Sequence, residues 1–200
     1  NYYQIAKCYR DEDSRKDRQP EFTQLDIEIS NGDPKIVQKI IESTMKHVLK
    51  TVYSIEVKTP FTKITYDEAM SLYGTDKPDL RIKETITDFT NIFMDTEISL
   101  IKETIKNNGT VRGFLINKLL SRSEIDNLDE LLKNEGSPGL GWFKIENKKV
   151  SGPLAKILNE KENNELVKND NCTMLFQSGK QDESSHYLDT LRRKIYSIPN

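Results

Sequence analysis

The alternation of apolar and polar residues at the start of the chain predicts a long β-hairpin. Residues 2–9 and 22–30 each alternate as β-strands do, with the charged segment 10–21 between them. The polar front face of the second strand takes Phe22, Gln24, Asp26 and Glu28. Its back face, with Leu25, Ile27 and Ile29, is apolar. A polar front over an apolar back presents a binding surface; Asp26 and Glu28 there could pair with basic groups or grip an amino group or a metal.

The residues after the hairpin are predicted to form a helix. Asp33 can cap a helix and Pro34 suits its first turn. Apolar or small side chains then recur at helical spacing, at Val37, Ile40, Ile41, Thr44, Val48 and Val52. We expect this helix to pack on the sheet. A short strand at 61–65 and a short helix at 66–73, stopped by Gly74, come next.

From about residue 84 the chain alternates short strands and helices, which predicts a smaller domain with its own core. Strands are expected at 111–116, 139–145 and 172–177, and helices at 121–134, 160–168 and 183–196. Ser121 and Glu124 have the spacing of a capping box. The predicted fold class is therefore α+β, with a domain boundary near 82–90 that separates residues 1–83 from 84–200.

Composition excludes several classes of function. The 200 residues carry a net charge of −2, so any RNA contact requires a local basic patch. Cys8 and Cys172 match no metal-ligand spacing and are expected to be buried thiols. His47 and His186 fall in predicted helices without ligand partners. There is no glycine-rich phosphate loop, no Gly-x-Ser-x-Gly elbow, and no apolar run near the roughly 20 residues of a membrane span.

The charged segment 10–21, RDEDSRKDRQPE, contains the best candidate chemistry. Its composition alone also fits a solvated turn. However, it contains Arg10, Arg15 and Arg18, and a guanidinium binds phosphate and carboxylate through paired hydrogen bonds. Arg10 ends the first strand, where it can be held over the front face as a clamp for a phosphate in a transition state. Arg15 and Arg18 lie further out, within reach of a nucleic-acid backbone.

Residues 2–30 resemble motif 2 of class II aminoacyl-tRNA synthetases, and more narrowly that of aspartate–tRNA ligases. RDED at 10–13 and DRQPEFTQ at 17–24 carry this resemblance. ITYDEAMSLYGTDKPDLRI at 64–82 is similar to a second segment of the same family. The remainder resembles the insertion domain of bacterial-type enzymes, which an archaeal amidotransferase subunit shares. The matching pieces are VRGFLI (111–116), LSRSEIDNLDELLKNEGSPGLGWFKIE (120–146), GPLAKIL (152–158) and LDTLRRKI (188–195).

The resemblance implies a partial class II antiparallel-sheet catalytic domain in 1–83 and the insertion domain in 84–200. It makes Arg10 the catalytic residue, which binds the α-phosphate of ATP and the carboxylate of aspartate, and Phe22 the aromatic that stacks on adenine. The implied ATP-binding residues are Arg10, Asp11, Glu12, Gln19 and Phe22. The implied aspartate-binding residues are Arg10, Asp26 and Glu28. The implied tRNA-binding residues are Glu12, Arg15 and Arg18.

The reaction implied by this resemblance has two steps. Aspartate attacks the α-phosphate of ATP, which gives aspartyl-adenylate and pyrophosphate, and the terminal ribose of tRNA(Asp) then takes the aspartyl group. Mg²⁺ is the expected cofactor, with ligands outside this chain. The full-length enzyme is expected to be a homodimer with no membrane partner.

We expect this chain to be a fragment, inactive by itself. It begins with Asn1 rather than Met, and nothing in it resembles the family's anticodon-binding barrel, motif 1 or motif 3. A non-catalytic RNA-binding module derived from a synthetase is the alternative, and the asparagine enzyme is a third interpretation. The Lys-, Asn- and Ile-rich composition favours the mitochondrial matrix, with the bacterial cytoplasm as the alternative.

Overall fold

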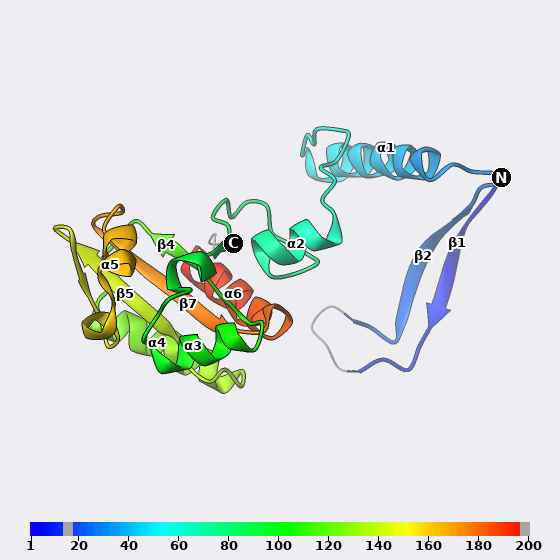
Figure 1. Cartoon of the computed structure of the whole chain (residues 1–200). Helices are drawn as coiled ribbons and strands as arrows, with labels where there is room; N and C mark the ends of the chain where they lie inside the picture. Colours follow the sequence, from blue (N-terminus) through cyan, green and yellow to red (C-terminus); the bar gives the residue numbers. More distant parts are fainter. Residues whose placement is uncertain (14–17, 197–200) are drawn as a thin grey trace. The chain divides into compact units, whose positions relative to one another are not determined.

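The computed structural model describes residues 1–13 and 18–196, and the chain forms two compact units that divide between Lys63 and Ile64. Strands and helices are both present, and every strand pair is antiparallel (Figure 1). The predicted α+β class is therefore confirmed. Across the described part of the chain, no helix has both the length and the apolar character that crossing a membrane requires.

The first unit consists of the predicted hairpin and one long helix. Strands β1 (Tyr2–Tyr9) and β2 (Glu21–Glu28) pair antiparallel, and α1 (Pro34–Tyr53) follows. Asp33 caps α1 as predicted, because its carboxylate accepts a hydrogen bond from the Lys35 backbone N–H at 2.8 Å. Ser54, in the left-handed conformation, ends the helix.

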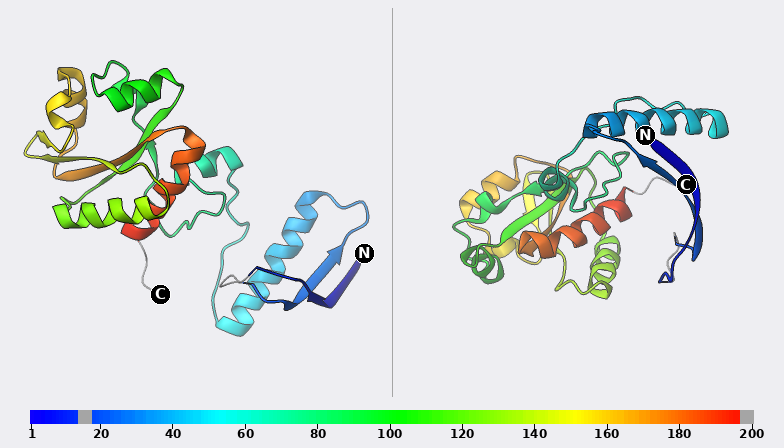
Figure 2. Two further views of the ribbon diagram at one scale, coloured as in Figure 1. Left: turned by 90° about the horizontal axis from the view of Figure 1, so that it is seen from below. Right: turned by 90° about the vertical axis from the view of Figure 1, so that its right-hand side faces the viewer.

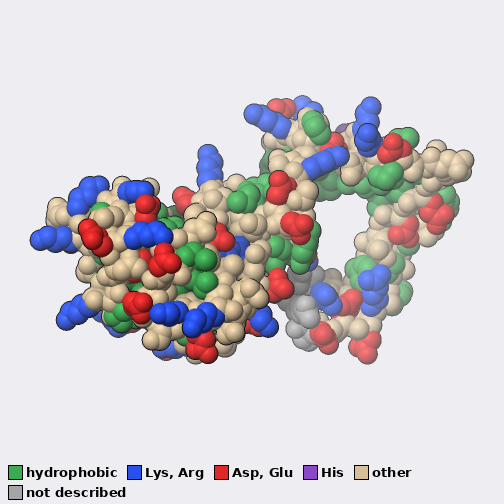
Figure 3. All heavy atoms as spheres, viewed as in Figure 1, with side chains coloured by type: hydrophobic (Ala, Val, Ile, Leu, Met, Phe, Trp, Pro, Cys, Tyr) green, Lys and Arg blue, Asp and Glu red, His purple; other side chains and the backbone are tan. Residues whose placement is uncertain are grey.

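The expected packing of α1 on the sheet is wrong, because α1 buries none of its residues. The apolar side chains at its helical spacing stay between 37% and 66% exposed: Ile36, Val37, Ile40, Ile41, Val48 and Val52. Figure 3 shows hydrophobic side chains on the surface of this unit. A ribbon of two strands is too narrow to cover a 20-residue helix.

The strand expected at 61–65 is also absent; these residues are irregular. They lie beside α1 instead. The backbone N–H of Phe61 donates to the Glu42 carboxylate at 2.9 Å, and the Lys63 ammonium donates to the Gln38 side chain at 2.5 Å. Side chains of α1 therefore hold this segment, through one backbone donor and one side-chain donor, in place of a sheet partner.

The second unit is built on a five-stranded antiparallel sheet (Figure 2). In spatial order the strands are β3 (Thr87–Asp88), β4 (Thr110–Ile116), β7 (Cys172–Gly179), β5 (Gly141–Glu146) and β6 (Lys149–Ser151). The helices are α2 (Tyr66–Tyr73), α3 (Ser99–Lys106), α4 (Arg122–Asn134), α5 (Glu160–Leu166) and α6 (Gln181–Ile195). Two 3₁₀ turns, η1 (Thr90–Phe93) and η2 (Ala155–Ile157), complete it.

Each face of this sheet carries its own hydrophobic cluster. Alternation along β7 supplies both, with Met174 and Phe176 in one cluster and Leu175 in the other. The first cluster is covered by η1, α3 and α5, and its rings Phe93, Phe143 and Phe176 stack on one another. The second cluster is covered by α4 and α6. The second unit therefore has the core that the first unit lacks.

The two compact units divide upstream of the boundary at 83/84 that we expected from the sequence. Helix α2 lies with the second unit, because Arg112 of β4 donates hydrogen bonds to the backbone carbonyls of Met70 and Ser71. The assignment of 1–83 to the catalytic domain and 84–200 to the insertion domain rests on resemblance to the family. The division into compact units does not test it, so it stays a prediction.

Candidate functional site

The register of the hairpin places the predicted front-face residues together. Cys8 pairs with Phe22, Ala6 with Gln24, Gln4 with Asp26, and Tyr2 with Glu28. Directly opposed residues of an antiparallel pair share a face, so these side chains form one surface. Phe22, Gln24 and Asp26 are half-buried on it, and Glu28 is exposed.

Arg10 and Phe22 meet at the loop end of this surface. The Arg10 backbone N–H donates to the Pro20 carbonyl at 2.9 Å and so continues the pairing beyond β1. The Arg10 guanidinium carbon lies 5.1 Å from the centroid of the Phe22 ring, within the range of a cation–π contact. A planar cation and an aromatic face therefore stand side by side at an open position, where they can take a phosphate and a flat ring.

An ion pair joins the two arms of the loop. The Arg18 guanidinium lies 2.7 Å from the Glu12 carboxylate, and the Glu12 side chain is only 17% exposed. Asp11 and Gln19 are exposed, one on each arm. Arg15 lies outside the described residues. The pair thus ties Arg18 to Glu12, two residues after Arg10 in the chain.

The hairpin does not bring Asp26 and Glu28 to the same spot as Arg10. They lie four and six residues along β2 from Phe22, which corresponds to about 13 and 20 Å at the rise of a strand. Asp26 accepts a long hydrogen bond of 3.5 Å from the Gln4 side chain. Only a ligand laid along the front face, or two ligands in line, would touch both ends.

The two thiols differ. Cys172 is buried as predicted, and burial raises the pKa of its thiol. The prediction is wrong for Cys8, which is half-buried and donates from its Sγ to the Gln24 side chain at 3.0 Å. A two-stranded ribbon has no second layer of its own, and no described residue of 1–63 is buried. Among the residues that the structure describes, no group of three or more His, Cys, Asp and Glu side chains is arranged to hold a metal ion.

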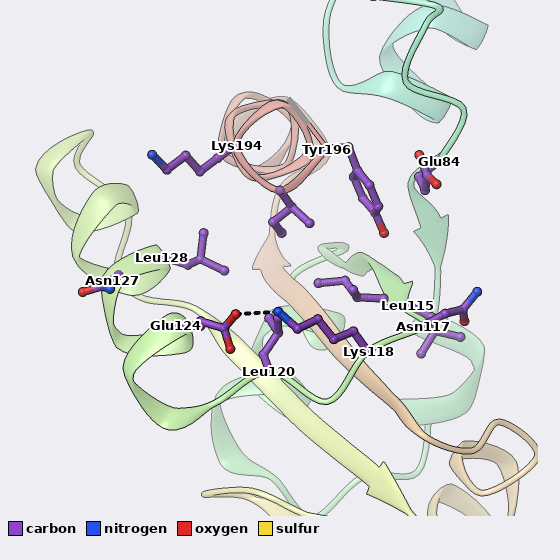
Figure 4. Close-up of a pocket in the computed structure, with 12 residues that line it drawn as sticks. Glu84, Leu115, Asn117, Lys118, Leu120, Glu124, Asn127, Leu128, Lys194 and Tyr196 are labelled. Carbon is purple, nitrogen blue, oxygen red and sulfur yellow. Dashed lines mark hydrogen bonds and ion pairs between the residues drawn. The ribbon is translucent and has the colours of Figure 1, made fainter. Parts of the chain in front are cut away.

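Sequence reasoning missed a groove of about 520 Å³ in the second unit. Figure 4 shows Leu115, Leu120 and Leu128 lining it, with Lys118 paired to Glu124. The Lys118 ammonium lies 2.7 Å from that carboxylate; this hydrogen bond and those from Ser121 lower the pKa of Glu124 to about 2. Tyr196 lines the groove, and burial raises its pKa to about 12. No sequence motif marks this groove, since residues from four separate segments form it.

The chain has close similarity to known proteins. A family model described as tRNA synthetases class II (D, K and N) matches residues 1–185. An aspartate–tRNA(Asp/Asn) ligase of Hydrogenobaculum sp. is 41% identical over 203 residues, which cover 100% of this chain and 34% of that protein. Aspartate–tRNA ligases of Shouchella clausii and Thermosipho africanus are 37% and 45% identical over 97% and 78% of the chain, and over 34% and 27% of their own lengths.

The chain thus spans about a third of the length of the curated relatives it matches. These relatives are bacterial synthetases. They give no support to the mitochondrial assignment that composition suggested.

Proposed function

The chain belongs to the class II tRNA synthetases of the D, K and N group, and we propose that it is part of an aspartate–tRNA ligase. The observation that carries the proposal is similarity over the whole chain to aspartate–tRNA ligases, together with Arg10 beside Phe22 on the hairpin that resembles motif 2. The parent enzyme would join aspartate to ATP and then transfer the aspartyl group to tRNA(Asp).

Arg10 is the proposed catalytic residue. Its side chain is exposed, and its guanidinium contacts the Phe22 ring. The guanidinium carbon lies 5.1 Å from the centroid of the Phe22 ring, whereas a purine between them would need two contacts of about 3.5–4 Å each, so it cannot enter there. Adenine would therefore stack on Phe22 as the guanidinium swings aside, which turns its N–H groups toward the α-phosphate. There it neutralises charge that grows as aspartate attacks.

The other proposed contacts follow the order of residues along the front face. Asp11, Glu12 and Gln19 surround the ATP at the loop end, and Glu12, Arg15 and Arg18 meet the tRNA acceptor end. Asp26 and Glu28 form the floor of the aspartate pocket. Their distance from Phe22 supports binding of ATP and aspartate in line along the strands rather than at one spot.

No covalent nucleophile is required in this reaction. Catalysis would come from positioning and from charge neutralisation by Arg10. ATP with Mg²⁺ is general to the family, and we place the Mg²⁺ ligands and the dimer-forming surface outside this chain. Because the relatives are bacterial, we propose the bacterial cytoplasm as the compartment.

The test is aspartate-dependent ATP–pyrophosphate exchange by the parent enzyme. We expect exchange with aspartate, and a loss of about 100-fold or more in Arg10→Ala, as for removal of a transition-state charge contact. Arg122→Ala is the matched control, because Arg122 pairs with Asp126 on the surface of α4. It should leave exchange unchanged.

Absence of exchange with either aspartate or asparagine would overturn the ligase proposal and favour the RNA-binding module. Exchange with asparagine alone would identify the sister enzyme. Normal exchange in Arg10→Ala would keep the ligase and remove the role proposed for Arg10.

A further inference from the structure

A buried arginine of the second unit is bonded to the end of α2. Arg112, in β4, is 2% exposed. Its Nη2 donates to the carbonyls of Met70 at 3.1 Å and Ser71 at 2.5 Å, and its Nη1 donates to the Ser185 hydroxyl of α6 at 3.0 Å. The last carbonyls of a helix carry partial negative charge, and here the Met70 carbonyl also accepts from the Gly74 N–H at 3.2 Å. Arg112 therefore acts as a cationic cap that the sheet supplies to α2.

The Arg112 guanidinium has as its hydrogen-bond partners the carbonyls of Met70 and Ser71 and the Ser185 hydroxyl. Among the described residues no carboxylate lies within ion-pair distance of it, although Asp88, its register partner on β3, exerts a favourable charge. Burial lowers the pKa of Arg112. A buried cation costs stability unless its N–H groups are satisfied. Here the acceptors are the α2 carbonyls and Ser185, so loss of α2 would leave the cation poorly paired.

A second buried arginine holds the segment that follows α2. Arg192, in α6, is 0% exposed, and its guanidinium carbon lies 5.1 Å from the centroid of the Tyr73 ring. Its Nη1 donates to the Ile82 carbonyl at 3.3 Å, and its Nη2 donates to Asp189 at 3.4 Å. The two arginines thus grip the last residues of α2 and the far end of the connector 74–82.

Gly74 lets the backbone approach closely between these points. It has a φ of +76°, and a Cβ added there would lie 2.3 Å from the Ser185 carbonyl oxygen of α6. Just beyond, the Ile86 N–H donates to the Leu72 carbonyl at 2.7 Å. The segment is therefore fitted to the second unit at both ends of the connector.

Hydrogen bonds hold the residues on either side of Ile64, which is the first residue of the second unit. The Lys63 ammonium bonds to Gln38 of α1, in the first unit. Thr65 caps α2, in the second unit, through a reciprocal capping box with Glu68. Ile64 is the residue between these two attachments.

We propose that Arg112 and Arg192 are positioning residues that lock α2 and the connector 74–82 to the sheet and α6. The lock goes beyond the proposed function and does not rest on it, whereas the role that it gives the insertion domain rests on the resemblance to the synthetase family. Residues 64–82 are the second string that resembles the synthetase family. The inference therefore gives the insertion domain a role, which is to set the placement of a segment that the resemblance assigns to the catalytic domain.

Hydrogen exchange of the 200-residue chain tests the lock. In Arg112→Met and Arg192→Met we expect protection of the α2 amides to fall about 10- to 100-fold, because a charge-assisted hydrogen bond shifts a local opening equilibrium by that much. Protection in β5 and β7 should stay within about threefold. Arg112→Lys keeps the charge and should restore part of the loss, whereas a purely volume-filling role would favour Met over Lys. Arg122→Met is the matched surface control.

Two outcomes would overturn the proposal. One is unchanged α2 protection in both methionine variants. The other is an equal loss of protection across α2, β5 and β7, which would make the arginines ordinary core residues. Should the methionine variants fail to fold, Gly74→Ala tests the same contact from the α2 side through its clash with Ser185, with the same criteria. The measurement requires neither ATP nor tRNA, so its failure is distinguishable from failure of the proposed function.

Discussion

At the scale of single residues, Glu124 takes part in two kinds of contact. The sequence predicted its capping box with Ser121 but not its ion pair with Lys118. Ser121 and Glu124 form the reciprocal capping box that their spacing predicts, with N–H to carboxylate and N–H to hydroxyl distances of 2.7 and 3.2 Å. Lys118 adds a hydrogen bond of 2.7 Å that no helical spacing indicates, since it lies before the helix begins. Residue spacing therefore predicts contacts within one turn of a helix. It does not predict a contact such as Lys118–Glu124, in which the chain turns between the two residues.

The low pKa of Glu124, about 2, gives a pH-dependence that can be measured. A carboxyl whose pKa is lowered by folding contributes stability above its unfolded pKa, near 4.5, and loses it as pH falls toward 2. In Glu124→Gln, the melting temperature should be lower than wild type at pH 6, and the difference should vanish toward pH 2. Glu130→Gln, on the exposed side of α4, is the control. A difference independent of pH would contradict the assignment.

The same limits apply to the candidate site. Period-two alternation correctly placed Phe22, Gln24, Asp26 and Glu28 on one face, because strand geometry alone fixes that. The nearness of Arg10 to Phe22 follows from one further hydrogen bond past the strand. The distance from Phe22 to Asp26 and Glu28 follows from the strand rise, whereas placing Arg10 at the Phe22 end required the register, which was not available from the sequence. The roles of these residues come from resemblance and stay predictions.

At the scale of elements, helices that carry their own start signals were predictable. Helices α1, α2, α4 and α5 all begin with a side-chain cap, and all four were expected. The missed α3 begins at Ser99, has eight residues, and follows Ile98, which provides no side-chain cap. Strands β3 and β6 have two and three residues, too few for a period to be visible. They form because β3 pairs with the longer strand β4, and β6 pairs with the longer strand β5.

Gly141 offers a test of how tightly β5 packs against β7. A Cβ added at Gly141 would lie 2.4 Å from the Phe176 ring, which stacks in the first hydrophobic cluster. Gly141→Ala should lower the free energy of unfolding by about 1–3 kcal/mol, the usual cost of overpacking. Gly179→Ala is the matched control, because a Cβ there meets no atom within 4 Å. Urea unfolding compares the two, and equal midpoints would mean that Phe176 shifts freely.

At the scale of the whole molecule, the distribution of buried residues explains why one expectation failed. The sequence correctly predicted an apolar stripe on α1, but a stripe does not say what covers it. No described residue of 1–63 is buried, while the second unit has two clusters. Helical period reports which side of a helix is apolar, and tertiary packing depends on surfaces elsewhere in the molecule. Residues 1–63 alone therefore lack the buried area that folding requires.

The two compact units divide at 63/64, whereas the boundary expected from the sequence lies at 83/84. Fragments that start at residue 64 or at residue 84 show which boundary delimits a stable domain. Residues 64–200 should unfold cooperatively, because both clusters and the acceptors of Arg112 and Arg192 are included. Residues 84–200 lose those acceptors: Arg112 keeps only the Ser185 hydroxyl, and Arg192 keeps its Asp189 partner but loses the Ile82 carbonyl. We expect the 84–200 fragment to be less stable by about 3 kcal/mol or more, the cost of stranding a buried charge. Thermal unfolding followed by circular dichroism measures the difference. Equal stability would mean that water satisfies both arginines when α2 is gone, and that residues 64–83 add nothing to the second unit.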